Sequence, residues 1–176
     1  MTRISLVDEN ATPEIAALAG KIRGARGGKL HIFYRALLHT PGLASAWFEF
    51  NNAVRFKTGL GDRARELVIM RVSALTGCDY VWSVHESQYA GAAGLTPQEV
   101  RALRDWRKSG DYGEKERALL AYVDAVTQEV AAPDDVFDSM CRHYTDQEIL
   151  EFTVLIGAYN MQARLLRSLG IGAENV

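Results

Sequence analysis

The sequence has few cysteines, no long apolar run and no marked excess of charge of either sign. Its two cysteines, Cys78 and Cys141, are too few for the disulfide framework of a small secreted domain. No uncharged apolar stretch reaches the roughly 18 residues of a transmembrane helix, and the first residues lack the apolar segment of a signal peptide. We therefore expect a cytoplasmic protein with reduced thiols and no membrane as partner.

The charge balance argues against nucleic acid as a partner. The 176 residues include 20 basic and 22 acidic side chains, for a net charge of −2. This balance gives no overall field that would attract nucleic acid or an anionic membrane surface. With 48% hydrophobic and 24% charged residues, the composition is typical of a packed globular protein.

Helical periodicity and helix-end signals fill the chain. The predicted helices cover residues 12–24, 30–38, 43–57, 62–76, 78–93, 114–130, 133–144 and 146–169. Thr96–Glu99 and Thr145–Glu148 carry the capping-box pattern, in which a threonine and a glutamate three residues later satisfy backbone N–H groups of the first turn. No segment shows the alternation of a half-buried strand, so the predicted fold class is all-α.

The chain is expected to form one domain over residues 1–176. Within it, N-terminal helices occupy 1–60, a central helix pair occupies 61–95, and C-terminal helices occupy 96–176. A weak internal repeat pairs Leu75-Thr76-Gly77 with Leu155-Ile156-Gly157. It is compatible with a domain made of two related helical halves. Gly157 lies inside an apolar helical stretch and predicts either a break or a close helix contact there.

The segment from Glu66 to His85 holds the residues best suited to chemistry. Cys78 falls at the start of a predicted helix, where unpaired N–H groups and the helix dipole stabilise a thiolate. His85 follows two helical turns later and lies on the same face. If the chain turns back at Gly77, the Glu66 carboxylate reaches the imidazole. The carboxylate then orients the imidazole, and the imidazole activates the thiol.

Each of these residues also has a simpler role available. A single cysteine in a helical protein is more often a small buried apolar side chain than a nucleophile. A single histidine is more often a surface residue or a satisfied core residue. Glu66 has Arg63 and Arg65 nearby as ion-pair partners, and Trp82 is a candidate core residue. The residues alone therefore leave catalysis open.

The spacing resembles the core motif of the carboxymuconolactone decarboxylase/alkylhydroperoxidase D-like (AhpD-like) superfamily. That motif has Glu, eleven residues, Cys, two residues, Cys, three residues and His, and Glu66, Cys78 and His85 match it in identity and spacing. The likeness covers about residues 43–170. It implies an AhpD-like helical bundle, a homo-oligomer (a dimer or a trimer of dimers) and a catalytic site at these three residues.

One position departs from the family motif. Val81 stands where the family has its second cysteine, so the chain cannot form the disulfide that the family's peroxidases use. The segment of Tyr80, Val81 and Trp82 resembles a branch in which a Trp-x-x-His pattern replaces the two cysteines. In that branch Cys78 is incidental. Cys141 is in a different predicted helix and is not expected to serve as a resolving cysteine.

The first functional hypothesis is a peroxidase-like oxidoreductase. In this hypothesis Cys78 attacks a hydroperoxide, and an external thiol reductant reduces the sulfenic acid that forms. Tyr80, Val81 and Trp82 then bind the substrate.

Two alternatives are kept beside the peroxidase. One is a thiol-independent acid–base enzyme in which His85 and Glu66 act on a small carboxylated lactone or organic acid. Arg71 or Arg63 then holds the carboxylate. The other is a non-catalytic helical subunit whose apolar surface serves oligomerisation.

No metal and no cofactor are expected. His31 and His39 lack a nearby third ligand, and His143 has only Cys141 beside it. The Gly24–Gly28 segment follows a predicted helix rather than a strand, and it lacks the lysine-serine ending of a phosphate-binding loop.

Large aromatic side chains crowd the region before the motif. They are Phe33, Tyr34, Trp47, Phe48, Phe50 and Phe56. Two or three short helices rarely bury this many rings alone, so part of the cluster is expected at an interface between copies of the chain.

Overall fold

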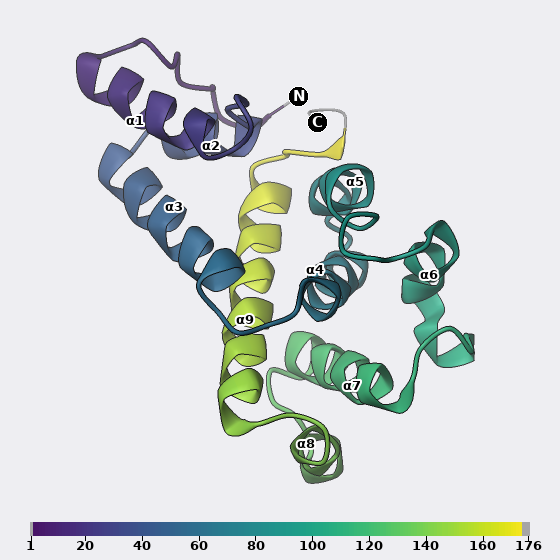
Figure 1. The fold of residues 1–176 in the computed structure, drawn as a ribbon. Coiled ribbons are helices and arrows are strands. Elements are labelled where there is room, and N and C mark those ends of the chain that lie inside the picture. The colour runs from purple at the N-terminus through teal and green to yellow at the C-terminus, as the bar shows by residue number, and fades with distance from the viewer. Residues whose placement is uncertain (1, 174–176) are drawn as a thin grey trace.

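The computed structural model describes residues 2–173, and every regular element in that range is helical (Figure 1). The elements are α1 (Pro13–Gly24), α2 (Ile32–Leu37), α3 (Pro41–Phe56), α4 (Asp62–Thr76), α5 (Asp79–Gln88), α6 (Pro97–Ala102), the 3-10 helix η1 (Leu103–Lys108), α7 (Glu114–Gln128), α8 (Asp134–Cys141) and α9 (Asp146–Ser168). The predicted all-α class is confirmed. No helix in the described range is long and apolar enough to cross a membrane.

The α4 helix lies at the centre of the fold. It packs against α5, α7, α9 and η1, which surround it in Figure 1. Every residue from Glu66 to Ser73 is buried, because neighbours cover the helix on all sides rather than along one stripe. The two charged residues in this stretch, Glu66 and Arg71, must therefore find their partners inside the protein.

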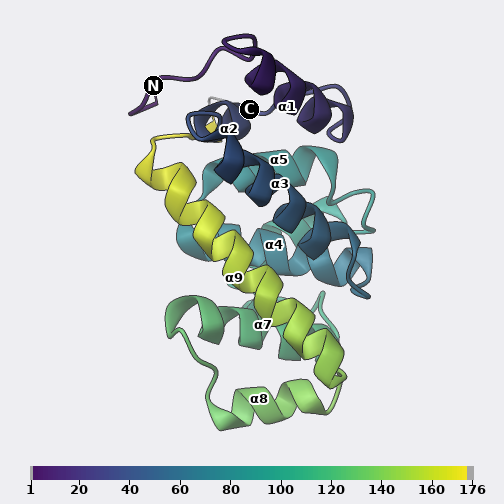
Figure 2. The same ribbon diagram turned by 90° about the vertical axis from the view of Figure 1, so that its left-hand side faces the viewer.

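The α9 helix runs diagonally across one side of the molecule and packs on α3, α4 and α7 (Figure 2). Its first turn has the predicted capping box, with Thr145 and Glu148 satisfying each other's backbone N–H groups. The helix continues without a break through Gly157, and the space beside this glycine is open. The predicted break or close helix contact at Gly157 is therefore wrong.

A tight turn at Gly77 joins α4 to α5. Gly77 has a φ of 60°, in the left-handed region that favours glycine. The N–H of the next residue, Cys78, donates to the carbonyl of Ser73 at 2.9 Å, which closes the end of α4. This turn lets α5 fold back against α4, as the spacing predicts.

The α5 helix is shorter than the sequence predicts. It ends at Gln88 rather than near residue 93. The N–H groups of Tyr89 and Ala90 both bond to the carbonyl of His85, so the chain leaves the helix there and turns at Gly94, whose φ is 81°. The predicted capping box of Thr96 and Glu99 then begins α6, with Thr96 as the N-cap residue.

The buried apolar side chains form two groups. The larger group lies among α1–α5 and α7–α9, and the smaller one joins α4 and α5 to α6, η1 and α7. Four of the six aromatic rings before the motif belong to the larger group; they are Phe33, Tyr34, Trp47 and Phe48. Phe50 and Phe56 are 41% and 57% exposed. The surplus aromatic surface is thus limited to these last two rings.

Candidate active site

Glu66 and His85 form a buried hydrogen bond. The Glu66 Oε2 and His85 Nδ1 atoms are 2.6 Å apart. The side chains of Glu66 and His85 are only 2% and 5% exposed. The residues are 19 positions apart in the chain, and the Gly77 turn brings their helices together. The predicted contact between the carboxylate and the imidazole is confirmed.

The partner of Nδ1 fixes the state of the imidazole. A carboxylate only accepts hydrogen bonds, so Nδ1 carries the proton and Nε2 has an unprotonated lone pair. Burial lowers the pKa of His85, while its hydrogen bond to the Glu66 carboxylate opposes this change. The ring is therefore neutral near pH 7, the form in which Nε2 can accept a proton.

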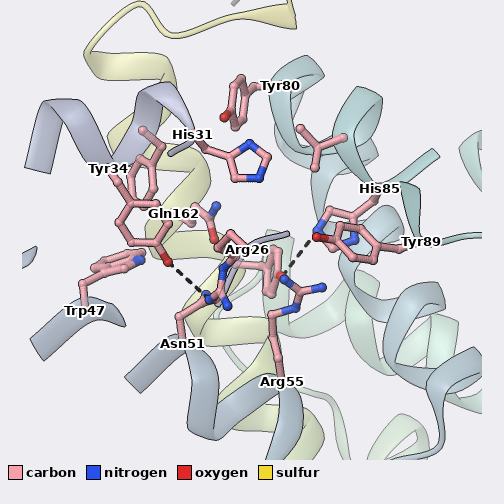
Figure 3. A pocket seen from close by; sticks show the side chains of 13 residues that line it. Arg26, His31, Tyr34, Trp47, Asn51, Arg55, Tyr80, His85, Tyr89 and Gln162 are labelled. Carbon is pink, nitrogen blue, oxygen red and sulfur yellow. Dashed lines mark hydrogen bonds between the residues drawn. The ribbon is translucent and has the colours of Figure 1, made fainter. Parts of the chain in front are cut away.

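His85 borders a pocket with a volume of about 50 Å³ (Figure 3). A bound water needs roughly 10–15 Å³ by this measure, so the pocket has room for a small molecule. Four parts of the fold build it: α3, α5, α9, and the α2 region with the segment that precedes it. No aspartate or glutamate is among the described residues that line it.

Tyrosine side chains lie beside the imidazole. The Tyr159 hydroxyl lies 3.4 Å from His85 Nε2, and the two rings meet edge to face at 5.7 Å. The Tyr89 ring lies 5.0 Å from the imidazole on another side. Burial raises the pKa of Tyr159 to about 12 and that of Tyr80 to about 12. Both hydroxyls thus stay protonated near neutral pH and can donate hydrogen bonds.

Arg55 supplies a buried positive charge to the same pocket. Its guanidinium lies 4.6 Å from the centre of the Tyr89 ring and 4.9 Å from that of Phe56, where ring faces attract cations. Its residue is 6% exposed, and no carboxylate of residues 2–173 lies within ion-pair distance of it. The Tyr89 side chain hydrogen-bonds to the guanidinium and the charge of Glu66 acts on it from further away, so Arg55 can still pair directly with an anionic ligand.

Arg55 lies outside the sequence motif, although the sequence contains a signal for it. Trp47, Asn51 and Arg55 follow one another at four-residue intervals, which places them on one face of α3. Polar residues on a face that otherwise carries buried aromatic and apolar side chains indicate a polar site. Tyr159 and Gln162 on α9 carry no comparable signal, because they lie 74 or more positions from His85 and only packing brings them near.

Cys78 lies apart from this pocket. It precedes α5 as predicted, but its side chain is 2% exposed, packs in the larger apolar group and does not line the pocket. Burial raises the pKa of the thiol above its ordinary value. The prediction of an acidic thiol is wrong, because desolvation outweighs the effect of the helix start. Cys141 is exposed at the end of α8, and both thiols are free.

The three residues predicted to bind substrate lie in different places. Tyr80 lines the pocket beside His85. Val81 is buried in the larger apolar group. Trp82 belongs to the smaller group, where its Nε1 donates to Glu86 at 3.0 Å. Two positions along a helix correspond to about 200° of rotation, so Trp82 faces away from Tyr80.

The arginines proposed from sequence to hold a carboxylate already have partners elsewhere. Arg71 Nε donates to Asp124 at 2.6 Å. Arg63 binds Glu99 at 2.5 Å and Glu116 at 2.7 Å. Neither arginine lines the His85 pocket. Among the described residues, the arginines that line it are Arg26 and Arg55.

No group of three or more histidine, cysteine, aspartate or glutamate side chains in the range 2–173 is arranged to hold a metal ion. Of the histidines considered as ligands, His31 lines the pocket and His39 Nε2 contacts the carbonyl of Ser5 at 2.8 Å.

Comparison with known proteins identifies the family. Residues 41–125 match the carboxymuconolactone decarboxylase family. A crystal structure from Agrobacterium tumefaciens, of a protein of unknown function described as a putative antioxidant defence protein AhpD, is 35% identical; the match covers 76% of this chain and 91% of that one, with a TM-score of 0.71. The chain therefore belongs to the carboxymuconolactone decarboxylase/AhpD-like superfamily.

Two further proteins resemble the chain. An uncharacterized peroxidase-related protein from Silicibacter sp. TM1040 shares the fold, with a TM-score of 0.84, 18% identity, and coverage of 99% of this chain and 93% of that one. The uncharacterized protein YnjA of Escherichia coli K12 is 27% identical over 123 residues, which are 69% of this chain and 67% of that protein.

Proposed function

We propose that the chain is a thiol-independent acid–base enzyme that acts on a small carboxylated organic acid or lactone in the His85 pocket. The observation that carries this proposal is the 2.6 Å bond between Glu66 and His85 beside a pocket lined by Arg55, which no carboxylate of the described range pairs, while Cys78 lies outside that pocket. Membership of a superfamily with a decarboxylase branch supports the substrate class.

The proposed chemistry assigns one role to each group. Arg55 holds the anionic group of the substrate by charge and hydrogen bonding. His85 Nε2 takes a proton from carbon next to a carbonyl and returns it in a later step, and Glu66 stabilises the imidazolium in between. The electrons of the broken C–H bond move onto the carbonyl oxygen, where the protonated Tyr159 hydroxyl donates a hydrogen bond.

A thiol peroxidase is the second candidate, and the superfamily's peroxidase-related members favour it. In that function Cys78 attacks a hydroperoxide and an external thiol reductant restores it. The burial of Cys78, the raised pKa of its thiol and the valine at position 81 oppose this candidate, because the reaction needs an accessible thiolate.

One experiment separates the two functions. Small carboxylated lactones and 2- and 3-oxo acids are incubated with the protein in D₂O, and proton NMR follows exchange at carbon or loss of CO₂. We expect activity in wild type and in Cys78→Ala, and a loss of about 100-fold or more in His85→Gln. The same proteins are assayed for hydroperoxide consumption with dithiothreitol. Hydroperoxide turnover that Cys78→Ala abolishes, without any exchange activity, would contradict the proposal.

We further propose that the protein is a homo-oligomer. Leu43 and Phe50 on α3, and Val154 and Met161 on α9, are each at least 40% exposed, and their two helices pack together. An interface between copies would cover this apolar face. Light scattering at micromolar concentration should give a multiple of the 19.5 kDa chain mass.

The matched variants are Phe50→Ser and Val130→Ser, which remove exposed apolar side chains from this face and from a distant loop. We expect only Phe50→Ser to lower the measured mass. A wild-type mass of one chain would contradict the assembly.

A further inference from the structure

Unpartnered buried polar atoms are concentrated at one pocket. Five buried side-chain nitrogen or oxygen atoms of residues 2–173 have no hydrogen-bond partner. Four of the five belong to residues that line the His85 pocket; they are Trp47 Nε1, Arg55 Nε, Gln162 Oε1 and the Tyr80 hydroxyl, of which the last also lies beside the backbone of Phe33. Such atoms are rare and costly in folded proteins. Their collection at one pocket indicates a ligand that bonds to them.

The chemistry of these atoms describes the ligand. Trp47 Nε1 and Arg55 Nε are donors only, so they require acceptor atoms on the ligand. Arg55 also carries a positive charge, and no aspartate or glutamate is among the described residues that line the pocket. The ligand therefore carries a negative charge, as a carboxylate does.

Gln162 requires the opposite kind of group. Its Oε1 atom can only accept, and it is buried without a donor. Gln162 comes from α9, whereas Trp47 and Arg55 lie two turns apart on α3. Figure 3 shows Gln162 near the middle of the pocket and Arg55 on the side nearer His85, while Trp47 lies on the opposite side with Tyr34 beside it. A ligand between Arg55 and Gln162 meets a donor and an acceptor at once.

We infer that the pocket binds a small anion that also carries a hydrogen-bond donor, such as a 2-hydroxy acid. Its carboxylate lies at Arg55, and its hydroxyl donates to Gln162. A volume of about 50 Å³ suits a molecule of only a few non-hydrogen atoms. This inference rests on the proposed function for the location of the site, because His85 lines the same pocket, and it narrows the substrate class.

Three probes of similar size separate charge from donor recognition. Lactate carries both groups, propionate carries only the charge, and propane-1,2-diol carries only hydroxyls. Isothermal titration calorimetry of the wild-type protein should show lactate binding about tenfold more tightly than propionate, since a buried acceptor left unpaired weakens binding by about that factor. The diol should show no measurable binding. Equal affinities for lactate and propionate, or for lactate and the diol, would overturn the inference.

Variants assign the two contacts. Gln162→Leu should lower lactate affinity to that of propionate and leave propionate affinity unchanged. Arg55→Gln should weaken both acids at least tenfold. Arg142→Gln, which changes an exposed arginine at the end of α8, should change neither. A lactate preference that survives Gln162→Leu in a protein with the wild-type unfolding midpoint would overturn the assignment.

The experiments distinguish failure of the binding inference from failure of the proposed acid–base function. A lactate preference without any exchange activity toward the acids and lactones would contradict the proposed acid–base function and leave the binding inference standing. Exchange activity toward those substrates without a lactate preference would overturn the binding inference and leave the function standing.

Discussion

Two arginines are equally buried in this protein, and they differ in what surrounds them. Arg71 on α4 and Arg55 on α3 are each 6% exposed. Arg71 donates to the Asp124 carboxylate and to the carbonyls of Leu103 and Arg104. Arg55 has aromatic rings beside it and no carboxylate within ion-pair distance in the described range. The first is built into the structure, and the second faces a pocket.

The difference shows how burial of a charge can be interpreted. A buried charge with all its partners in the chain contributes to folding or specificity. A buried charge whose partner is missing is costly, so it persists where a function needs it. The unpaired nitrogen of Arg55 and the other unpartnered atoms at the pocket therefore mark the site more clearly than any single residue of the sequence motif.

The largest expected effect is on the free energy of unfolding, and it comes from breaking the buried Arg71–Asp124 ion pair. Arg71→Leu leaves Asp124 with only Trp106 and the more exposed Arg107 as partners. We expect a loss of about 3–5 kcal/mol in the free energy of unfolding, because the change leaves a buried carboxylate poorly compensated. Urea denaturation followed by circular dichroism measures it. Arg63→Leu, in a partly exposed ion-pair cluster, is the control and should cost about 1 kcal/mol. Equal losses in the two variants would remove the contrast.

At the His85 pocket, the expected effect is a dependence of stability on pH. Burial lowers the pKa of His85 in the folded protein, whereas the unfolded chain has the ordinary value of about 6.5. The unfolded state therefore binds more protons as the pH falls through about 6.5, and stability decreases by up to about 1.4 kcal/mol per pH unit for this group.

His85→Gln should flatten that decrease, and the difference between the two proteins isolates His85 from His31, whose pKa burial also lowers. Denaturation curves between pH 5 and pH 8 provide the test. Parallel profiles for wild type and variant would show that His85 is not held neutral by the fold.

The smallest expected effect is the alkylation of Cys78, which lies near neither Arg71 nor Arg55. Its thiol is buried and its pKa is raised, so alkylation by iodoacetamide near neutral pH should modify only the exposed Cys141. Mass spectrometry of intact protein should find one adduct in wild type and none in Cys141→Ser. Rapid modification of Cys78 in folded Cys141→Ser would return the thiol to the candidate site.

The sequence predicts the parts of this account that depend on local signals. Helix starts at Thr96 and Thr145, the Gly77 turn and the Glu66–His85 contact all follow from spacing over a few helical turns. The environment of Cys78 does not, because the side on which a thiol at a helix start lies depends on how neighbouring helices pack. Arg55, Tyr159 and Gln162 lie on other helices than His85. The sequence does not show that these helices pack so that the three side chains meet His85.

The most direct test of the central claim is the stability of ligand-free Arg55→Leu. If Arg55, whose neighbours are Tyr89, Phe56 and the more distant Glu66 charge, is held for the sake of a ligand, leucine removes a buried charge that no carboxylate of the described range pairs directly. The free energy of unfolding should then stay within about 1 kcal/mol of wild type or rise. A loss of about 3–5 kcal/mol, comparable to that expected for Arg71→Leu, would show that Arg55 is a structural residue and would contradict the account.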